Sequence, residues 1–434
     1  MLITFDYNKL EQGLRALTSV VNDKAVKEDM KNIIFRYTTD GSVMLIAYNT
    51  RVFCGTQMKE AAQIDWEKDE PKDGYFQLKA SLIKTLATYR GQKTIKATKV
   101  VIHVAPNYSQ VDVLTEAADE KSQYAALYKQ REKYRIESPK VISKIIYDIE
   151  HNMADFEGTP VKASALNRYI SMLLPTLKVD GTDNVSCRIM FAHGYVYTAP
   201  YIYFALMPNK LPDVLNNMQL TTTASVFLGN FLSNIGDEDV TVATELAEGA
   251  GSALNTQMLV KFKHGDTLAV VRAYTATNAL KCEAYTTHGN TYVMLNRAYL
   301  LETLRKAEVI QRSECTFDFV IREGEAEGTI TTDSWRQPLA IEGAKLDVHE
   351  FMGHSYYSEG SNGAELKVSV AFKVEQLRKM VFAHAHDITE TQVILYFEPA
   401  TNATFKIAVT DATEQWQTKL NSVSQAKANT LPWA

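Results

Sequence analysis

The chain repeats one weak pattern of apolar residues six times, and this repeat limits the possible folds more than any other feature. In each copy a short β-like run ends with an apolar residue. A second apolar residue follows five positions later, and a third follows four positions after the second. The first copy is centred on Leu10 and the last on Leu377, while the fourth, QLTTTASVFLGNFLSNIG, is degenerate. The four-residue step is helical, so each copy predicts a strand followed by an amphipathic helix.

Strand-like runs with turn signals follow the predicted helices. Asp40-Gly41 is a typical hairpin signal, and His193-Gly194 and His264-Gly265 separate similar runs. The unit is therefore a strand, a helix and a small antiparallel meander, with about 73 residues per unit between the first and last centres. A unit of this size rarely buries its own core, whereas units paired two by two give three domains of roughly 140 residues.

We therefore expect an α+β chain of three similar domains. Residues 116–137 form a charged, helix-prone insertion, and the Ile/Val spacing of residues 139–158 predicts a further helix that links the first two domains. The expected boundaries are 1–138 for the first domain, 139–288 for the second, 289–420 for the third and 421–434 for a mobile tail.

Basic residues gather in the six predicted helices, although the chain carries a net charge of −5. The helix windows hold thirteen Lys and Arg against four acidic residues, and the fourth helix has no basic residue. Two interpretations are open: these are ordinary solvated helix faces, because Lys and Arg favour helices, or they form a surface that contacts DNA phosphates without reading sequence. The candidate DNA-binding residues are Lys9, Arg15, Lys79, Lys84, Arg90, Lys162, Arg168, Arg297, Arg305, Lys306, Lys373, Arg378 and Lys379.

Sequence motifs of catalysis are missing. There is no GxSxG or HExxH motif, and Glu248–Gly251 is not followed by the Lys-Ser/Thr of a phosphate-binding loop. The four cysteines lie far apart, and His384 and His386 are best read as solvated. We expect a protein that is not an enzyme, with no cofactor, metal site or disulfide. No apolar run is long enough to cross a bilayer and no secretory signal is evident, so we expect a cytoplasmic location.

Strand-helix-meander units paired into three domains, with basic helices, resemble the DNA polymerase sliding clamps of bacteria and bacteriophages, the β-clamp family. The opening MLITFDYNKLEQGLRALTSVV resembles the first strand and helix of that family. The segment VSVAFKVEQLRKMV, followed by VILYFEP and FKIAVTD, resembles its last unit. The resemblance covers almost the whole chain and rests on repeat architecture, not on a diagnostic motif.

The resemblance implies the DNA-clamp fold, in which two chains join head to tail, helices line a central hole and sheets form the outer wall. It also implies a non-catalytic processivity factor that encircles double-stranded DNA without sequence specificity. Its partners would be a DNA polymerase, a clamp loader and a second copy of the chain, in the cytoplasm of a bacterium or a phage-infected cell.

The family also has a peptide pocket between its second and third domains. The matching positions here, Thr198–Tyr203 and Thr410–Leu420, nominate Tyr201, Ile202 and Trp416, with ordinary packing at a domain boundary as the alternative. The first of these segments departs from the family because it has aromatic residues and lacks a basic one.

Two other functions remain open from the sequence. One is a clamp-fold accessory factor of replication or transcription that does not close into a ring. The other is a β-rich structural protein of a virion. A ring stays on circular DNA and slides off a linear end, whereas an open binder treats both alike.

Overall fold

The structure is a computed structural model of the 434-residue chain. The chain divides into two compact units, residues 1–166 with 226–274 and residues 167–225 with 275–434. The expected three-domain division stays a prediction. The structure describes all residues except 22–24, 26, 60–61, 68–69, 82–96, 106–107, 116–125, 134–138, 155, 178–186, 199–202, 248–255, 277–288, 311–313, 355–356, 361–362, 376, 379–391, 399–405, 411–416 and 422–434.

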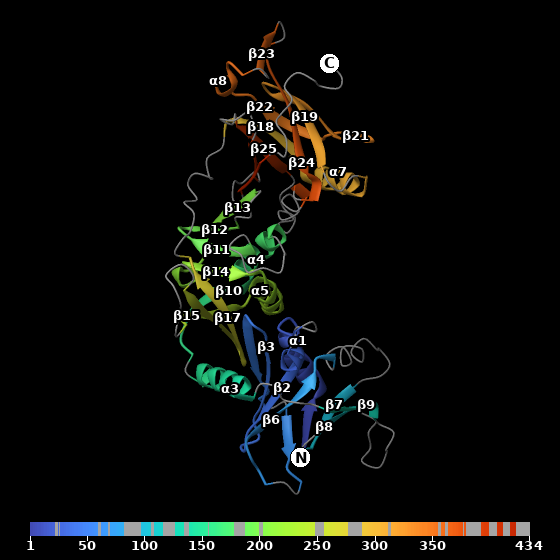
Figure 1. The fold of residues 1–434 in the computed structure, drawn as a ribbon, viewed down its shortest axis with the longest axis vertical. Coiled ribbons are helices and arrows are strands. Elements are labelled where there is room, and N and C mark those ends of the chain that lie inside the picture. Colours follow the sequence, from blue (N-terminus) through green and yellow to red (C-terminus); the bar gives the residue numbers. More distant parts are fainter. Residues whose placement is uncertain are drawn as a thin grey trace. The chain divides into compact units, whose positions relative to one another are not determined.

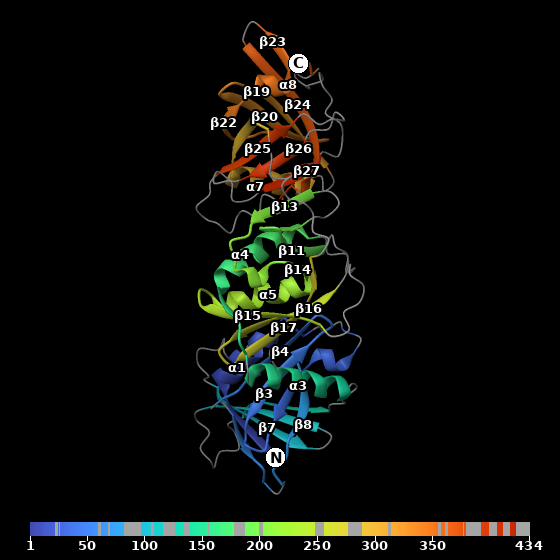
Figure 2. The ribbon, with the colours of Figure 1, turned by 90° about the vertical axis from the view of Figure 1, so that its left-hand side faces the viewer.

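The larger sheet of the first unit joins strands from separate parts of the sequence. Among the described residues it has eight antiparallel strands, and β17 pairs with β4 so that Val270 lies opposite Phe53. Figures 1 and 2 show these strands. In spatial order they are β10 (Thr159–Lys162), β15 (Asp239–Leu246), β16 (Gln257–His264), β17 (Thr267–Thr275), β4 (Val52–Gln57), β3 (Val43–Tyr48), β2 (Asn32–Tyr37) and β6 (Gly74–Lys79).

A second antiparallel sheet in this unit corrects one expectation. The insertion 116–137 was expected to favour a helix, but residues 126–133 form the strand β9, which pairs with β8. The backbone pairing offered by a neighbouring strand outweighs the weak helix propensity of a charged segment. In spatial order the strands are β5 (Ala62–Asp65), β1 (Leu2–Asp6), β7 (Ala97–Ala105), β8 (Tyr108–Thr115) and β9 (Ala126–Lys133).

Helix α1 (Tyr7–Leu17) packs against strands of both sheets of the first unit. Leu10 and Leu14 are fully buried, as the repeat predicted. The core beside them is aromatic: the ring of Phe35 lies 6.1 Å from that of Phe5 and stacks 4.9 Å from that of Phe76. The first predicted unit is therefore confirmed as a strand and an amphipathic helix.

A further helix, α3 (Pro139–Ala154), covers the face of the larger sheet opposite α1 (Figure 1). Side chains on β3 alternate: Leu45 lies beneath Gly13 of α1, whereas Met44 and Ile46 pack with the buried isoleucines of α3. All six residues of β3 are buried for this reason. The expected helix within residues 139–158 is confirmed.

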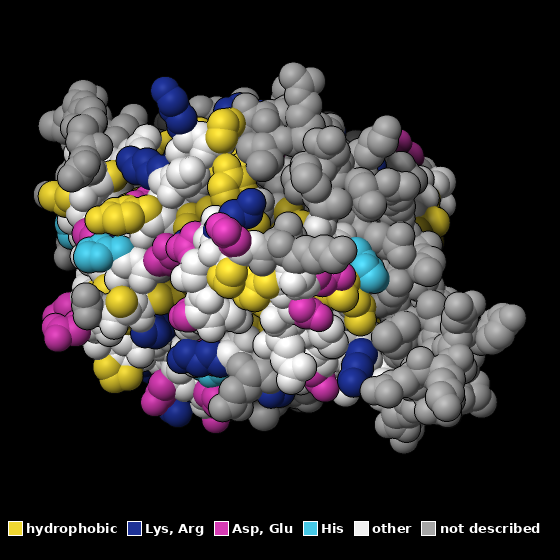
Figure 3. Space-filling view, turned by 90° about the horizontal axis from the view of Figure 1, so that it is seen from below, with side chains coloured by type: hydrophobic (Ala, Val, Ile, Leu, Met, Phe, Trp, Pro, Cys, Tyr) yellow, Lys and Arg dark blue, Asp and Glu magenta, His cyan; other side chains and the backbone are white. Residues whose placement is uncertain are grey.

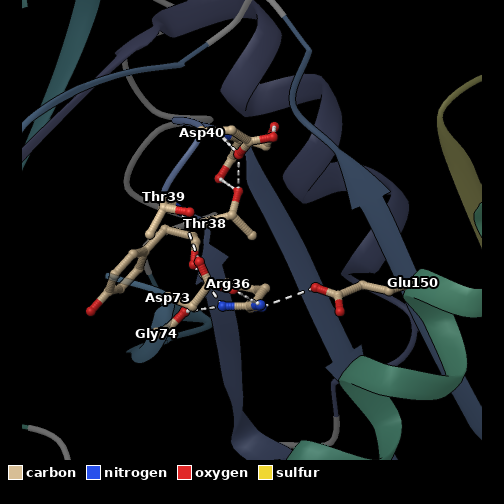
Figure 4. Close-up of polar contacts among 9 residues, drawn as sticks. Arg36, Thr38, Thr39, Asp40, Asp73, Gly74 and Glu150 are labelled. Carbon is tan, nitrogen blue, oxygen red and sulfur yellow. Dashed lines mark hydrogen bonds and ion pairs between the residues drawn. The ribbon is translucent and has the colours of Figure 1, made fainter. Parts of the chain in front are cut away.

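An ion-pair network fixes the C-terminal half of α3 to the sheet (Figure 4). The guanidinium of Arg36 on β2 donates to Glu150 of α3 and to Asp73, both at 2.9 Å. It also donates to the carbonyl oxygens of Tyr37 and Gly74. Burial alone would lower the pKa of Arg36, but the hydrogen bonds to Asp73 and Glu150 raise it above its ordinary value. The guanidinium is thus a permanent cation that joins three elements.

The second unit also contains two antiparallel sheets among its described residues, and β13 continues the larger one by pairing with β27. The larger sheet consists in order of β14 (Met218–Thr221), β11 (Arg188–Ala192), β12 (Tyr195–Thr198), β13 (Tyr203–Pro208), β27 (Gln417–Asn421), β26 (Lys406–Thr410), β25 (Gln392–Glu398), β18 (Thr291–Asn296) and β22 (Ile341–Lys345). The smaller sheet consists of β21 (Trp335–Pro338), β20 (Glu325–Thr332), β19 (Glu314–Arg322), β24 (Gly363–Lys373) and β23 (Tyr357–Gly360).

Helix α7 (Arg297–Ile310) contributes to the core of the second unit through Leu300 and Leu304. These side chains belong to one buried cluster with residues of both sheets, including Phe319 and Phe397, whose rings lie 5.4 Å apart. The remaining described helices are α4 (Ala163–Leu173), α5 (Thr222–Ile235), α8 (Val348–Phe351) and the 3-10 helices η1 (Glu28–Lys31), η2 (Leu174–Thr176) and η4 (Asp213–Leu215).

The predicted hairpin turns are confirmed. β2 and β3 pair across Gly41, whose φ is 84°. β11 and β12 pair across His193 and Gly194, whose φ values are 52° and 78°. Two positive φ angles in a two-residue loop match the right-handed twist of the strands that it joins.

The packing of α3 against the sheet gives a first prediction. A Cβ on Gly55 would lie 2.7 Å from Cγ2 of the buried Ile149, so Gly55→Ala should destabilise the first unit by about 1–3 kcal/mol. Ile149→Ala should cost about 2–4 kcal/mol. In an Ile149→Ala background, Gly55→Ala should cost little further stability, because the Ile149 Cγ2 with which the new Cβ would clash is already absent. Urea unfolding followed by circular dichroism measures this coupling.

The matched control is Tyr147→Ala, which removes a side chain of α3 that is 65% exposed. It should change the free energy of unfolding by less than about 0.5 kcal/mol. Strictly additive effects of the Gly55 and Ile149 substitutions would contradict the packing described for α3.

Candidate nucleic-acid interface

Helix α1 presents a polar face because its start is fixed by the strand before it. Asp6 ends β1 and caps the helix, accepting a 2.9 Å hydrogen bond from the backbone N–H of Lys9. This register buries Leu10 and Leu14 and leaves Lys9 and Arg15 exposed. Arg15 is ion-paired with the buried Glu11, so its charge is partly compensated.

Helices α4 and α5 carry little charge. Arg168 is exposed on α4, and it is the one charged residue of that helix. Lys162 was expected in the same helix window, but it is the last residue of β10 and pairs with Asp239 at 3.1 Å. The exposed residues of α5 are uncharged, in agreement with the missing basic residues of the fourth repeat.

Helix α7 carries more Lys and Arg residues than any other described helix, namely Arg297, Arg305 and Lys306, but it also carries Glu302 and Glu308. Asn296 caps it by accepting a 3.0 Å hydrogen bond from the N–H of Tyr299. This leaves Arg305 and Lys306 exposed, and Lys306 pairs with Glu302 at 3.0 Å. A neighbouring predicted residue, Arg378, is half-buried and pairs with Glu308 of α7 at 2.7 Å.

The helix faces are therefore only weakly positive. Each of α1, α4 and α7 carries one more basic than acidic residue, and α5 carries none of either. Ion pairs compensate several of the cations. Few phosphate contacts give weak, salt-dependent binding without sequence preference. Such faces suit a protein that moves along DNA better than one that holds a fixed site.

The other predicted residues are less informative. Lys79 and Lys373 are the last residues of β6 and β24, so both precede the expected helices instead of lying within them, and Arg297 is the first residue of α7. The rest of the prediction, namely Lys84, Arg90 and Lys379 for DNA and Tyr201, Ile202 and Trp416 for the peptide pocket, lies outside the described residues.

The described residues bear on the expectations for metal ligands, cysteines and surface charge. No three His, Cys, Asp or Glu residues among those described are placed to hold a metal ion. The three described cysteines are buried, and burial raises the pKa of Cys315 to about 12. Seen from below, basic and acidic side chains are intermixed, with no extended basic area among the coloured residues (Figure 3). No described helix is long and apolar enough to span a bilayer.

The exposed bases give a second prediction. A triple variant, Lys9→Glu, Arg168→Glu and Arg305→Glu, should weaken binding to a duplex at least tenfold at low salt, because it replaces attraction to phosphates by repulsion. Fluorescence anisotropy with a labelled duplex at two salt concentrations measures it. The control, Lys72→Glu, Lys210→Glu and Lys345→Glu, changes the net charge equally at exposed positions outside these helices. An equal loss in the control would show that only net charge matters.

Comparison with known proteins gives no match to any family model or curated protein. Solved structures do match. The DNA polymerase sliding clamp of Bacillus subtilis is 11% identical with a TM-score of 0.66, over 98% of this chain and 99% of that one. DNA polymerase III subunit beta of Borrelia burgdorferi is 9% identical with a TM-score of 0.67, over 98% of both chains. The Helicobacter pylori beta clamp, solved with a DNA ligase peptide, is 10% identical with a TM-score of 0.60, over 98% and 100%. The chain thus has the fold of the bacterial sliding clamps, a mixed architecture of helices and antiparallel sheets.

Proposed function

We propose that this chain is a processivity factor, a sliding clamp of the bacterial or bacteriophage type that encircles duplex DNA and tethers a DNA polymerase. The observation that carries the proposal is the extent of the fold likeness, which spans 98% of the chain and essentially all of each matched clamp. The role that we propose is non-catalytic.

The weakly basic helices support the same function. A closed ring is kept on DNA by its topology, so its contacts to phosphates need not be strong. Loose, sequence-independent contacts also allow movement along the duplex. The exposed Lys9, Arg168 and Arg305 are the described residues that we assign to this surface.

The assembly that follows is a ring of two copies joined head to tail, each with the three domains expected from the repeat. The cell would load it with a clamp loader, in the cytoplasm of a bacterium or a phage-infected host. Short peptides of the polymerase and other replication proteins would bind a pocket that includes Tyr201, Ile202 and Trp416. The DNA ligase peptide bound by the Helicobacter pylori clamp is an example of such a ligand on a matched structure.

The decisive test compares retention on circular and linear DNA. Light scattering should first give a mass near twice 48.7 kDa. The protein should then co-elute with a nicked circular plasmid and be lost when a restriction enzyme linearises it. A loader-containing extract serves where spontaneous closure is slow.

Equal retention on both forms of DNA would contradict the ring and indicate an open accessory factor. Absence of DNA binding in either case, with or without the extract, would favour a structural protein. The triple variant of Lys9, Arg168 and Arg305 is the matched control, since it should reduce retention on the circle without changing the mass.

A further inference from the structure

A groove of about 440 Å³ runs beside helix α3 in the first unit. One wall is the N-terminal half of α3, and the other is formed by η1 and the turn between β3 and β4. Arg272 of β17 also lines the groove. Helix α3, which forms one wall, covers the sheet face opposite the one on which α1 packs (Figure 1).

The floor of this groove is apolar and firmly held. Tyr48, Phe53 and Ile145 line it, and they are 3%, 6% and 7% exposed. All three belong to the core cluster that joins α3 to the sheet, and Met30 packs against that cluster from the side. Val141 stands at the edge of the floor with 43% of its surface exposed. A ligand with one large apolar side chain would therefore complete a surface that is already rigid.

The rim of the groove is basic. Lys27, Lys140, Lys144 and Arg272 line it and are exposed, and none of the four takes part in an ion pair within the described part of the chain. Two other bases of this unit are compensated: Arg36 pairs with Glu150, and Lys261 pairs with Glu245. The one acidic residue among the described lining residues is Asp148. Four cations against one carboxylate leave a local positive potential over an apolar floor.

The length of the groove selects a short peptide. Lys140 and Asp148 are eight residues apart on α3, which corresponds to about 12 Å along the helix axis. An extended chain advances about 3.3 Å per residue, so about four residues fit along this wall. We propose that the groove binds a short acidic segment of a partner protein that inserts one large apolar side chain between its carboxylates.

A single strand of DNA is the other polyanion that a basic groove attracts, but the floor disfavours it. Bases bind to such proteins by stacking on exposed aromatic faces. The rings of Tyr48 and Phe53 are almost completely covered, so they offer no open face on which a base could stack. The observations therefore favour the peptide.

This groove is a different candidate site from the proposed peptide pocket: its lining residues belong to the first unit, whereas Tyr201, Ile202 and Trp416 belong to segments of the second unit. It does not depend on the proposed function either, since binding is measured without DNA. A chain that fails to encircle DNA can still bind the peptide, and a true clamp can lack this second site. The two failures are thus distinguishable.

The experiment uses the full chain and three fluorescein-labelled hexapeptides, EDGFED, EDGLED and EDGWED, in an anisotropy titration. At least one should bind saturably, and its affinity should fall as salt rises from low to physiological. The matched peptides KKGFKK and EDGGED should bind at least about tenfold more weakly, because one reverses the charge and the other removes the apolar side chain.

Two variants locate the site. Lys140→Glu with Lys144→Glu should weaken binding about tenfold, because two exposed attractive pairs become repulsive. Val141→Asp should weaken it about fivefold by placing a carboxylate at the edge of the floor. The control Lys72→Glu with Lys345→Glu makes the same change of charge elsewhere and should alter affinity less than about twofold. Circular dichroism melting verifies that each variant is folded.

Several results would overturn the proposal. These are no saturable binding of any of the three peptides up to about 1 mM, an equal loss in the control variant, and unchanged affinity in Val141→Asp. Displacement of the peptide by a dT12 oligonucleotide that binds more tightly would assign the groove to nucleic acid instead. A lower solution mass of the Lys140→Glu, Lys144→Glu variant would assign this face to contact between copies of the chain.

Discussion

Backbone hydrogen bonding across strands that are distant in sequence is the constraint on which the rest of this structure depends. A repeat of about 73 residues makes only a few strands, and their outer edges carry unpaired N–H and C=O groups. In the first unit β4 meets this requirement by pairing with β17, and in the second unit β13 does so with β27. Continuous sheets result, and each provides one wall for the helices that pack on it. The position of every exposed base on α1 or α7 follows from that packing.

The repeat could be predicted because its signals are local. Leu10 and Leu14 have helical spacing, Asp6 can cap, and Asp40-Gly41 favours a hairpin. The sequence could not reveal which strand edges meet, since the pairing of Val270 with Phe53 joins segments more than 200 residues apart and depends on backbone geometry. The strand β9 was missed for the same reason. A charged segment has the composition of a helix until a neighbouring strand offers it hydrogen-bond partners.

The number of basic residues in the helices could be predicted from the sequence, but not which of them form ion pairs. Counting Lys and Arg in the helix windows identified the basic faces of α1 and α7, yet the structure pairs Arg15 with Glu11, Lys162 with Asp239 and Arg378 with Glu308. Partners such as Glu308 lie within the windows, but their contacts depend on tertiary packing. Conversely, the windows excluded α3, whose exposed Lys140 and Lys144 have no ion-pair partner among the described residues. A count over predicted helices cannot distinguish a compensated cation from an available one.

Because α3 covers one face of the larger sheet, this part of the chain cannot bury that face until α3 has been synthesised. Met44 and Ile46 point away from α1 and are buried by isoleucines that leave the ribosome about a hundred residues later. The partner strand of β4 follows later still, at Thr267–Thr275. The N-terminal segment therefore spends much of its synthesis with an apolar sheet face in water and an unpaired edge. A nascent chain with an exposed apolar sheet face and an unpaired strand edge is of the kind that chaperones bind. The first unit completes its folding only when β17 has left the ribosome.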